Sequence, residues 1–263
     1  MNYDVKKAVV LCAGRGVRLG VLSRYLPKAM LPLGEKPALH YLLEEISIAG
    51  IKEVLLIVGH HKNAIEQYFY EYKNEKEFER IQDLEIKFLT QDALNGTGGG
   101  VLLAKNFVGK NNFLVAFADD VTKPEDKTCA KLINQFKKVR ENVMAVREVE
   151  MKNAHKYGIV FSKNIDIYKN KKSFSKNIFQ VGKIIEKPEK PESNLVNFGR
   201  YVFTPQIFDI LKGLKPHKNN EIYLTDALSI ILKNKLYAFK IQNPTFDLGS
   251  AQTYIKAFIS FNS

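Results

Sequence analysis

The first 150 residues alternate between short apolar runs and amphipathic stretches, and this alternation constrains the fold more than any other feature of the sequence. The runs Lys6–Leu11 and Glu53–Gly59 are short, apolar and followed by glycine, as is typical of buried strands. Between them, Leu39–Ala49 carries apolar side chains at i, i+3, i+4 and i+7, which predicts a helix that ends at Gly50. Strands and helices in this order predict a Rossmann-like α/β fold with a mostly parallel sheet flanked by helices.

Apolar runs and helical spacing of apolar residues also predict the other strands and helices. Strands are expected at Glu85–Gln91, Asn112–Asp120, Asn142–Val149, Gly158–Ser162, Lys183–Glu186, Phe198–Phe203 and Leu236–Ile241. Helices are expected at Ala64–Tyr72 with Asn63 as its cap, near Val101–Asn106 after a glycine-rich turn, and at Lys127–Arg140, Pro205–Leu211, Thr225–Lys233 and Ala251–Phe261. Residues 1–263 are therefore expected to form one domain, whose part after residue 150 completes the sheet and adds a small β-rich lobe.

The net charge raises the question of a nucleic-acid partner. The 263 residues carry 40 Lys+Arg against 28 Asp+Glu, which gives a formal net charge of +12. The lysines are scattered along the chain and interleaved with glutamates, and only Lys169–Lys176 forms a local cluster. No nucleic-acid partner is therefore expected, although a diffuse positive field would help to capture small polyanions such as nucleotides.

Two further features bear on the compartment. No apolar run approaches the roughly 18–20 residues that cross a bilayer, so no membrane partner is expected. The first apolar stretch, Ala8–Ala13, is too short to be the core of a signal peptide. Only two cysteines occur, Cys12 and Cys129, so a disulfide framework is excluded and a cytoplasmic location is expected.

A glycine-containing loop follows the first expected strand. Gly14 and Gly16 would let backbone N–H groups approach an anion closely, although a tight turn without a ligand would also use glycine here. The loop does not fit the dinucleotide fingerprint, because Leu19 stands where that pattern needs a third glycine. Arg18 and Lys28 lie in the same long polar loop, and two cations beside a glycine cradle suit a triphosphate. Each could also be an ordinary surface charge.

This region resembles the signature of the sugar-1-phosphate nucleotidylyltransferases, and among them the bacterial UTP–glucose-1-phosphate uridylyltransferases. The resemblance lies in Ala13-Gly14-x-Gly16-x-Arg18, in Pro27-Lys28-Ala29-Met30-Leu31-Pro32-Leu33 and in Lys36-Pro37. It implies that Ala13, Gly14 and Gly16 wrap the nucleotide phosphates, while Arg18 and Lys28 neutralise them. It also implies a nucleotide-binding half over 1–150, a sugar-binding half over 151–263, and UTP and glucose 1-phosphate as small-molecule partners. A homo-oligomer is expected.

Asp119, Asp120 and Asp247 are candidates for a metal-binding site. Asp119 and Asp120 end the expected strand that begins at Asn112, and ligands of open α/β sheets lie at such strand ends. Carboxylate and phosphate oxygens together favour Mg²⁺, although either aspartate could simply cap a turn. Asp247 precedes the last expected helix, which it or Ser250 could cap. The resemblance implies that Asp119 and Asp247 hold the Mg²⁺ and that Asp120 plays a supporting part.

Two further groups of residues are assigned by the resemblance. Gln91 and Gly96 match the stretch that reads the pyrimidine base, although a flexible turn would also explain the glycines of Gly96–Gly100. Gly158, Glu186, Lys187 and Gly199 match the segments that bind the sugar and its phosphate, whereas an isolated Glu–Lys pair would be an ordinary surface ion pair. The segment Asn220–Ala227 also matches, and we interpret it as mainly structural with Thr225 or Asp226 as a helix cap.

The chain departs from the family pattern at several positions: Val17 replaces a threonine, Gly20-Val21 a proline, Arg24 a lysine and Gly99 a histidine. These departures leave the charged set intact. They also leave room for another triphosphate such as dTTP or CTP, for another sugar 1-phosphate, and for a catalytically silent nucleotide-binding homologue. No Ser/His/Asp or Cys/His arrangement is recognisable, and none is needed if a sugar phosphate supplies an oxygen nucleophile that is already anionic.

Overall fold

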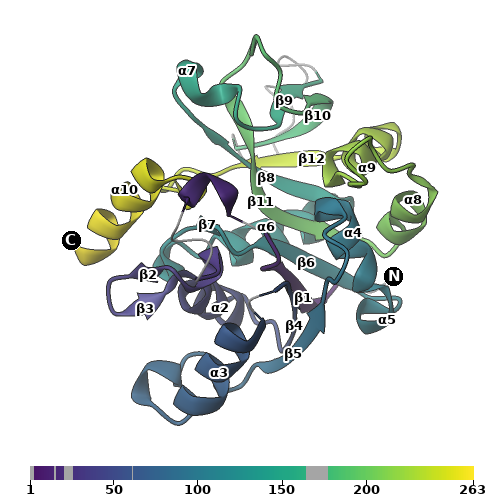
Figure 1. Ribbon diagram of the computed structural model, residues 1–263. Coiled ribbons are helices and arrows are strands. Elements are labelled where there is room, and N and C mark those ends of the chain that lie inside the picture. The colour runs from purple at the N-terminus through teal and green to yellow at the C-terminus, as the bar shows by residue number, and fades with distance from the viewer. Residues whose placement is uncertain (1–2, 15, 21–25, 61, 164–176) are drawn as a thin grey trace.

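The computed structural model describes residues 3–14, 16–20, 26–60, 62–163 and 177–263. The central element is a sheet that has nine strands within these residues (Figure 1). Its strands are β1 (Val5–Leu11), β4 (Glu53–Val58), β5 (Glu85–Thr90), β6 (Asn112–Phe117), β8 (Val143–Glu148), β9 (Ile159–Ser162), β10 (Ile178–Ile185), β11 (Leu195–Phe203) and β12 (Tyr237–Lys240). Their order across the sheet is β5-β4-β1-β6-β11-β8-β12-β10-β9.

The sheet is parallel in the first half of the chain and mixed in the second. β5, β4, β1 and β6 are parallel neighbours, and β8 and β12 are parallel to each other. β11 lies between β6 and β8 and is antiparallel to both, and β10 is antiparallel to β12 and β9. The predicted α/β fold is thus confirmed, and a strand from the second half of the chain is inserted between two strands of the first half.

Helices cover both faces of the sheet because the strands are apolar on both faces. Side chains of successive β1 residues point to opposite faces: Ala8 and Val10 belong to one buried cluster and Val9 to the other. The helices on the first face are α2 (Ala38–Ile48), α3 (Lys62–Tyr72) and α6 (Thr128–Val139). Those on the second face are α4 (Gly96–Leu103), α5 (Lys105–Val108), α8 (Ile207–Gly213) and α9 (Leu224–Ile231).

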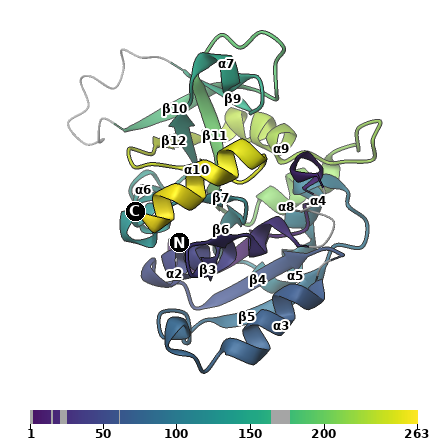
Figure 2. The ribbon, with the colours of Figure 1, turned by 60° about the vertical axis from the view of Figure 1, so that its left-hand side comes forward.

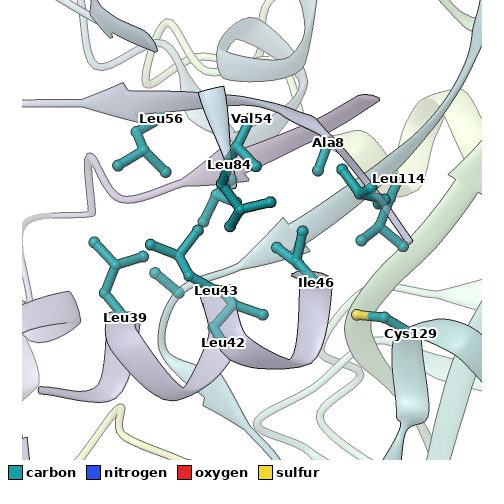
Figure 3. Close-up of a cluster of buried hydrophobic side chains, with 14 of the residues drawn as sticks. Ala8, Leu39, Leu42, Leu43, Ile46, Val54, Leu56, Leu84, Leu114 and Cys129 are labelled. Atoms are coloured by element: carbon teal, nitrogen blue, oxygen red, sulfur yellow. The ribbon is translucent and has the colours of Figure 1, made fainter. Parts of the chain in front are cut away.

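The helix α2 shows how the sequence pattern becomes packing. Its apolar residues Leu39, Leu42, Leu43 and Ile46 are fully buried. Figure 3 shows them directed towards Ala8, Val54, Leu56 and Leu114 of the sheet. The helix stops where Gly50 adopts a positive φ of 79°, as its sequence predicts.

A third, smaller cluster joins the two ends of the chain. It contains Leu19, Leu33, Val121, Leu248 and Ala257, all buried. The last of these lies on α10 (Ala251–Asn262), the yellow helix of Figure 2. This helix contacts the short strands β2 (Pro32–Leu33) and β13 (Phe246–Asp247). This packing brings the residues after the glycine loop next to the segment that precedes α10.

Four local predictions are wrong. The glycines from Gly96 onwards do not form a turn before a helix; they form the first turns of α4 itself. Asn63 lies inside α3 and does not precede it. Thr225 and Asp226 lie inside α9, whose N-cap is Tyr223. β6 ends at Phe117, and Asp120 begins the separate short strand β7 (Asp120–Val121).

Three further predictions concern the cap of α10, the lysine cluster and the membrane. Ser250, the second candidate cap of α10, is confirmed as that cap, because its hydroxyl accepts a hydrogen bond from the Thr253 N–H. The Lys169–Lys176 cluster and positions Val21 and Arg24 lie outside the described residues. None of the helices that the structure describes combines the length and the apolar character required to span a membrane.

Candidate active site

One cavity of about 830 Å³ lies beyond the carboxyl ends of β1 and β6, and the two halves of the chain share its lining. All the residues predicted from the sequence as site residues line it: Ala13, Gly14, Gly16, Arg18, Lys28, Gln91, Gly96, Asp119, Gly158, Glu186, Lys187, Gly199 and Asp247. Parallel strands that end at the same edge of the sheet explain how segments far apart in sequence meet there.

The glycine loop is shaped by the strands on either side of β1. The Cys12 N–H donates to the Ile57 carbonyl of β4, 2.8 Å away, so the chain leaves the sheet only after Cys12. Gly16 has a φ of 64°, in the left-handed region that glycine adopts at little cost. The space above Gly14 is open, because a Cβ there would meet no atom within 4 Å. The loop therefore offers unobstructed backbone to a ligand in the cavity.

The two predicted cations reach the cavity from different short helical turns. Arg18 lies in η1 (Val17–Leu19), and its guanidinium lies against Gly249, where a Cβ would be only 2.6 Å from Nη2. Lys28 begins η2 (Lys28–Met30), and its Nζ lies 3.0 Å from Oδ2 of Asp119. Glycine at position 249 thus leaves space that the end of the Arg18 side chain occupies.

The pKa values of Asp119 and Asp120, which follow β6, are shifted in opposite directions. Burial disfavours the charged form of Asp119, but its pKa is still lowered because Lys28 donates a hydrogen bond to it and Arg18 adds positive charge. Burial raises the pKa of Asp120 to about 7, and the negative charges of Asp119 and Asp247 add to this rise while Arg147 opposes it. Asp120 accepts a hydrogen bond from the Gly199 N–H at 2.9 Å, so it holds the chain of β11 in place.

Asp247 joins this group through strand pairing. β13 pairs with β7 so that Asp247 lies opposite Asp120, and the Leu248 N–H donates to the Asp119 carbonyl at 2.8 Å. The carboxylate of Asp247 accepts from the Gly249 N–H at 2.6 Å and from the Tyr157 hydroxyl at 2.8 Å. Both oxygens are therefore fixed in orientation, and each keeps a further lone pair for another partner.

The acidic residues fit a cation that is also held by a substrate. Among the described residues no three His, Cys, Asp or Glu side chains come close enough to enclose a metal ion by themselves. Mg²⁺ is commonly bound by one or two carboxylates together with phosphate oxygens and water, and Asp119 with Asp247 supplies such a pair. The negative charges of Asp119 and Asp247, which add to the effect of burial on the pKa of Asp120, would be offset by a divalent cation.

The cavity wall that includes Gly96 is built by close backbone packing. Gly96 has a φ of 86°, and a Cβ there would be 2.6 Å from the Ile222 carbonyl oxygen. The Gly98 N–H donates to that same oxygen at 2.8 Å, and the Ile222 N–H donates to the Asn95 carbonyl, also at 2.8 Å. Gly96 and Gly98 therefore admit the segment around Ile222.

The cavity is also lined by the four residues that are expected to bind the sugar and its phosphate: Gly158, Glu186, Lys187 and Gly199. A Cβ on Gly158 would be 3.1 Å from Oε2 of Glu186, so glycine keeps space beside that carboxylate. Lys187 has a φ of 40°, unusual for a residue with a side chain, in the turn that follows β10. Its Nζ lies 3.4 Å from Glu186 with 62% of the side chain exposed, so this ion pair is weak and the ammonium is available to an anion.

Gly199 is explained by packing. A Cβ there would lie 2.6 Å from both the Phe117 side chain and Oδ2 of Asp120. Its N–H already donates to Asp120, so a direct role in binding sugar stays a prediction.

The structure adds cavity-lining residues that the sequence reasoning did not single out. Glu221 and Tyr223 line the cavity, although their segment Asn220–Ala227 was interpreted as mainly structural. Asn219, Tyr157 and Asn197 also line it. Most of Asn219–Tyr223 lies outside regular elements, so no apolar periodicity marks which side chains face inwards. Tyr157 could have been suspected because it adjoins Gly158.

Comparisons with known proteins place the chain among nucleotide-transferring enzymes. The family described as nucleotidyl transferase matches residues 7–262. A UTP–glucose-1-phosphate uridylyltransferase of Staphylococcus epidermidis is 31% identical over 277 residues, which cover 98% of this chain and 92% of the relative.

Two solved structures extend this likeness. A UDP-glucose pyrophosphorylase complexed with UDP-glucose has a TM-score of 0.86 at 28% identity, covering 98% of this chain and 99% of the other. A UTP-bound enzyme of the same kind from Acinetobacter baumannii has a TM-score of 0.80 at 27% identity, covering 98% and 93%.

Proposed function

The chain belongs to the nucleotidyl transferase family, and from that premise we propose that it transfers the uridylyl group of UTP to glucose 1-phosphate, giving UDP-glucose and pyrophosphate. The observation that carries this proposal is the convergence of Arg18, Lys28, Asp119, Lys187 and Asp247 on a single cavity. Cations and carboxylates from five separated segments meet there, beside a glycine loop, as a polyphosphate substrate requires.

The chemistry needs no general base. A phosphate oxygen of glucose 1-phosphate is already anionic and attacks the α-phosphorus of UTP in line with the leaving group. The new bond joins that oxygen to the α-phosphorus, the bond from the α-phosphorus to the bridging oxygen breaks, and pyrophosphate leaves with the electron pair. Catalysis then consists of positioning two anions and neutralising their charge.

Each charged side chain has a place in this scheme. Arg18, held over Gly249, would stabilise the charge that develops on the leaving pyrophosphate. Lys28 and Lys187, which both line the cavity, would bind the reacting phosphates. Gln91 and Gly96 would contact the base, and Gly158 and Glu186 the sugar hydroxyl groups.

We propose Mg²⁺ as the metal of this site, held by Asp119 and Asp247 and by substrate phosphates. When bound, Mg²⁺ supplies charge neutralisation and alignment of phosphate oxygens. Lys28 keeps Asp119 ionised, and the Tyr157 hydroxyl and the Gly249 N–H orient the carboxylate of Asp247.

We also propose a cytoplasmic homo-oligomer. Cys12 and Cys129 are both free thiols, which suits a reducing compartment. Ile255, Phe258 and Ile259 are exposed at i, i+3 and i+4 spacing on α10 and offer an apolar stripe to a second copy.

The proposal is tested by pyrophosphate release. The purified chain with Mg²⁺ is mixed with UTP, dTTP, CTP or ATP, each against several sugar 1-phosphates. We expect UTP with glucose 1-phosphate to give the highest rate, and Arg18→Ala to reduce turnover about 100-fold or more with unchanged folding. A higher rate with another pair would change the substrates, and no pyrophosphate from any pair would indicate a silent nucleotide-binding homologue.

A further inference from the structure

Arg147 is a buried cation that contacts the cavity wall and has no part in the proposed chemistry. Only 6% of this β8 residue is exposed. In the part of the chain that the structure describes, its guanidinium forms no ion pair with a carboxylate, and its Nε has no hydrogen-bond partner. A charge is costly to bury without an ion-pair partner, so arginine at this position needs a reason other than packing.

The guanidinium contacts two segments that are far apart in the sequence. Its Cζ lies 5.1 Å from the ring centre of Tyr157, which follows α7 (Met151–Ala154). Its Nη1 donates to the carbonyl and to the hydroxyl of Thr245, at 3.3 and 3.2 Å. The Tyr157 hydroxyl donates to Oδ2 of Asp247 at 2.8 Å, and Thr245 precedes Asp247 by two residues. Arg147 thus holds both the phenol that orients the Asp247 carboxylate and the backbone that leads to it.

The backbone around Tyr157 is fixed from a third side, by the residues expected to bind the sugar phosphate. The Tyr157 carbonyl accepts from the Lys187 N–H at 3.2 Å. The next carbonyl, that of Gly158, accepts from the Asn197 N–H at 2.8 Å. With its backbone held in this way and its ring held by Arg147, Tyr157 keeps its hydroxyl directed at the carboxylate of Asp247.

We propose that Arg147 is a positioning residue, which holds the Asp247 carboxylate in place for a divalent cation through the Tyr157 ring and through Thr245. The inference rests on the proposed function, because that function assigns the cation to Asp119 and Asp247. Groups that orient a metal-binding side chain matter to the metal, and their loss commonly weakens metal binding about 10- to 100-fold.

Two simpler roles for Arg147 predict different changes in cation binding. If Arg147 acted only through its charge, its removal would strengthen the binding of a divalent cation, because like charges repel. If it only filled space, an apolar side chain of similar length would leave cation binding unchanged. If it positions Asp247, its removal weakens cation binding. The direction of the change therefore separates the three roles.

The experiment measures the dissociation constant of Mn²⁺, a paramagnetic substitute for Mg²⁺, from the electron paramagnetic resonance signal of the free ion. The full chain is used with and without UDP-glucose, and pyrophosphate is left out so that no turnover occurs. Arg147→Met removes the charge and the donors, and Tyr157→Phe removes only the hydroxyl. Arg140→Met is the matched control, because the Arg140 guanidinium lies 5.2 Å from the Tyr3 ring centre and Arg140 does not line the cavity.

We expect Arg140→Met to bind Mn²⁺ as the wild-type chain does. The dissociation constant should rise about tenfold in Arg147→Met and in Tyr157→Phe. In an Asp247→Asn background, Arg147→Met should add less than about twofold, because the carboxylate on which it acts is already lost. Stronger or unchanged Mn²⁺ binding in Arg147→Met, or a further loss of about tenfold in the Asp247→Asn background, would overturn the inference.

Arg147→Lys covers the case in which Arg147→Met does not fold. Lysine keeps the charge but lacks the planar group that can lie on a ring and donate to Thr245 at the same time. Mn²⁺ binding weakened about threefold or more in Arg147→Lys would support the inference, and binding equal to that of the wild-type chain would overturn it. Pyrophosphate release is measured separately, so a chain that shows this dependence on Arg147 but releases no pyrophosphate would refute the proposed function alone.

Discussion

Asp247 illustrates how much a single carboxylate of this site depends on its neighbours. Its two oxygens accept hydrogen bonds from Gly249 and Tyr157, and its strand places it opposite Asp120. Arg147 lies with its guanidinium 5.1 Å from the Tyr157 ring centre, so a cation supports the phenol that orients the carboxylate. A metal ion would be attracted by the negative charge of the Asp247 carboxylate.

Replacing Asp247 with Asn tests that property with little change of shape. The amide oxygen can still accept from the Gly249 N–H, while the charge is lost. We expect the Mg²⁺ concentration for half-maximal pyrophosphate release to rise by at least the roughly tenfold that loss of even an indirect metal contact costs. Asp209→Asn, on a side chain that is 82% exposed and remote from the cavity, is the control. An unaltered Mg²⁺ titration in Asp247→Asn would remove this residue from the metal site.

At the scale of elements, the sequence predicts what depends on local pattern. β1, β4 and α2 follow from apolar runs and helical spacing, and Ser250 follows from the preference of serine for N-caps. The glycines of α4 were misassigned because glycine favours turns in isolation. Gly96 and Gly98 are glycine because Ile222, more than 120 residues away, packs too close for a side chain at either position.

The capping box of α10 gives a prediction at this scale. The Ser250 hydroxyl accepts from the Thr253 N–H at 3.3 Å, and the Thr253 hydroxyl accepts from the Ser250 N–H at 3.2 Å. Ser250→Ala removes the first bond and should lower the free energy of unfolding by about 1 kcal/mol. Urea unfolding followed by circular dichroism measures this loss.

Ser260→Ala is the control for that measurement, because it makes the same substitution in the interior of the same helix. Alanine is favoured there, so the free energy of unfolding should stay the same or rise slightly. Equal destabilisation by the two substitutions would show that the cap contributes nothing.

At the scale of the whole molecule, the site is assembled by contacts that no local pattern records. The charged residues could be predicted because the resemblance preserves their order along the chain. The insertion of β11 between β6 and β8 could not be predicted, because the pairing of strands that are about 80 residues apart leaves no periodic pattern in the sequence. Glu45 and Arg200 escaped notice for the same reason, although both are fully buried behind the cavity.

Glu45 and Arg200 join α2 to β11 through an ion pair with Nη2 and Oε2 3.4 Å apart. Arg200 also donates to the Asp120 carbonyl at 2.7 Å, while Glu45 accepts from the Thr122 hydroxyl at 2.9 Å and from the Cys129 N–H at 2.6 Å. Burial alone would lower the pKa of Arg200, but the acidic groups around it, Glu45 foremost, together raise that pKa. The pair thereby anchors the chain on which Asp120 and Gly199 are placed.

Glu45→Gln keeps the shape of this side chain and leaves the buried guanidinium without its counter-charge. Breaking a buried pair in this way costs about 3–5 kcal/mol, so the variant should unfold at much lower urea concentration than the wild-type chain. Asp83→Asn breaks an exposed pair with Lys52, whose side chains are 74% and 63% exposed, and should change the free energy of unfolding by less than about 1 kcal/mol. If Glu45→Gln were no less stable than Asp83→Asn, the pair would not hold the two halves together.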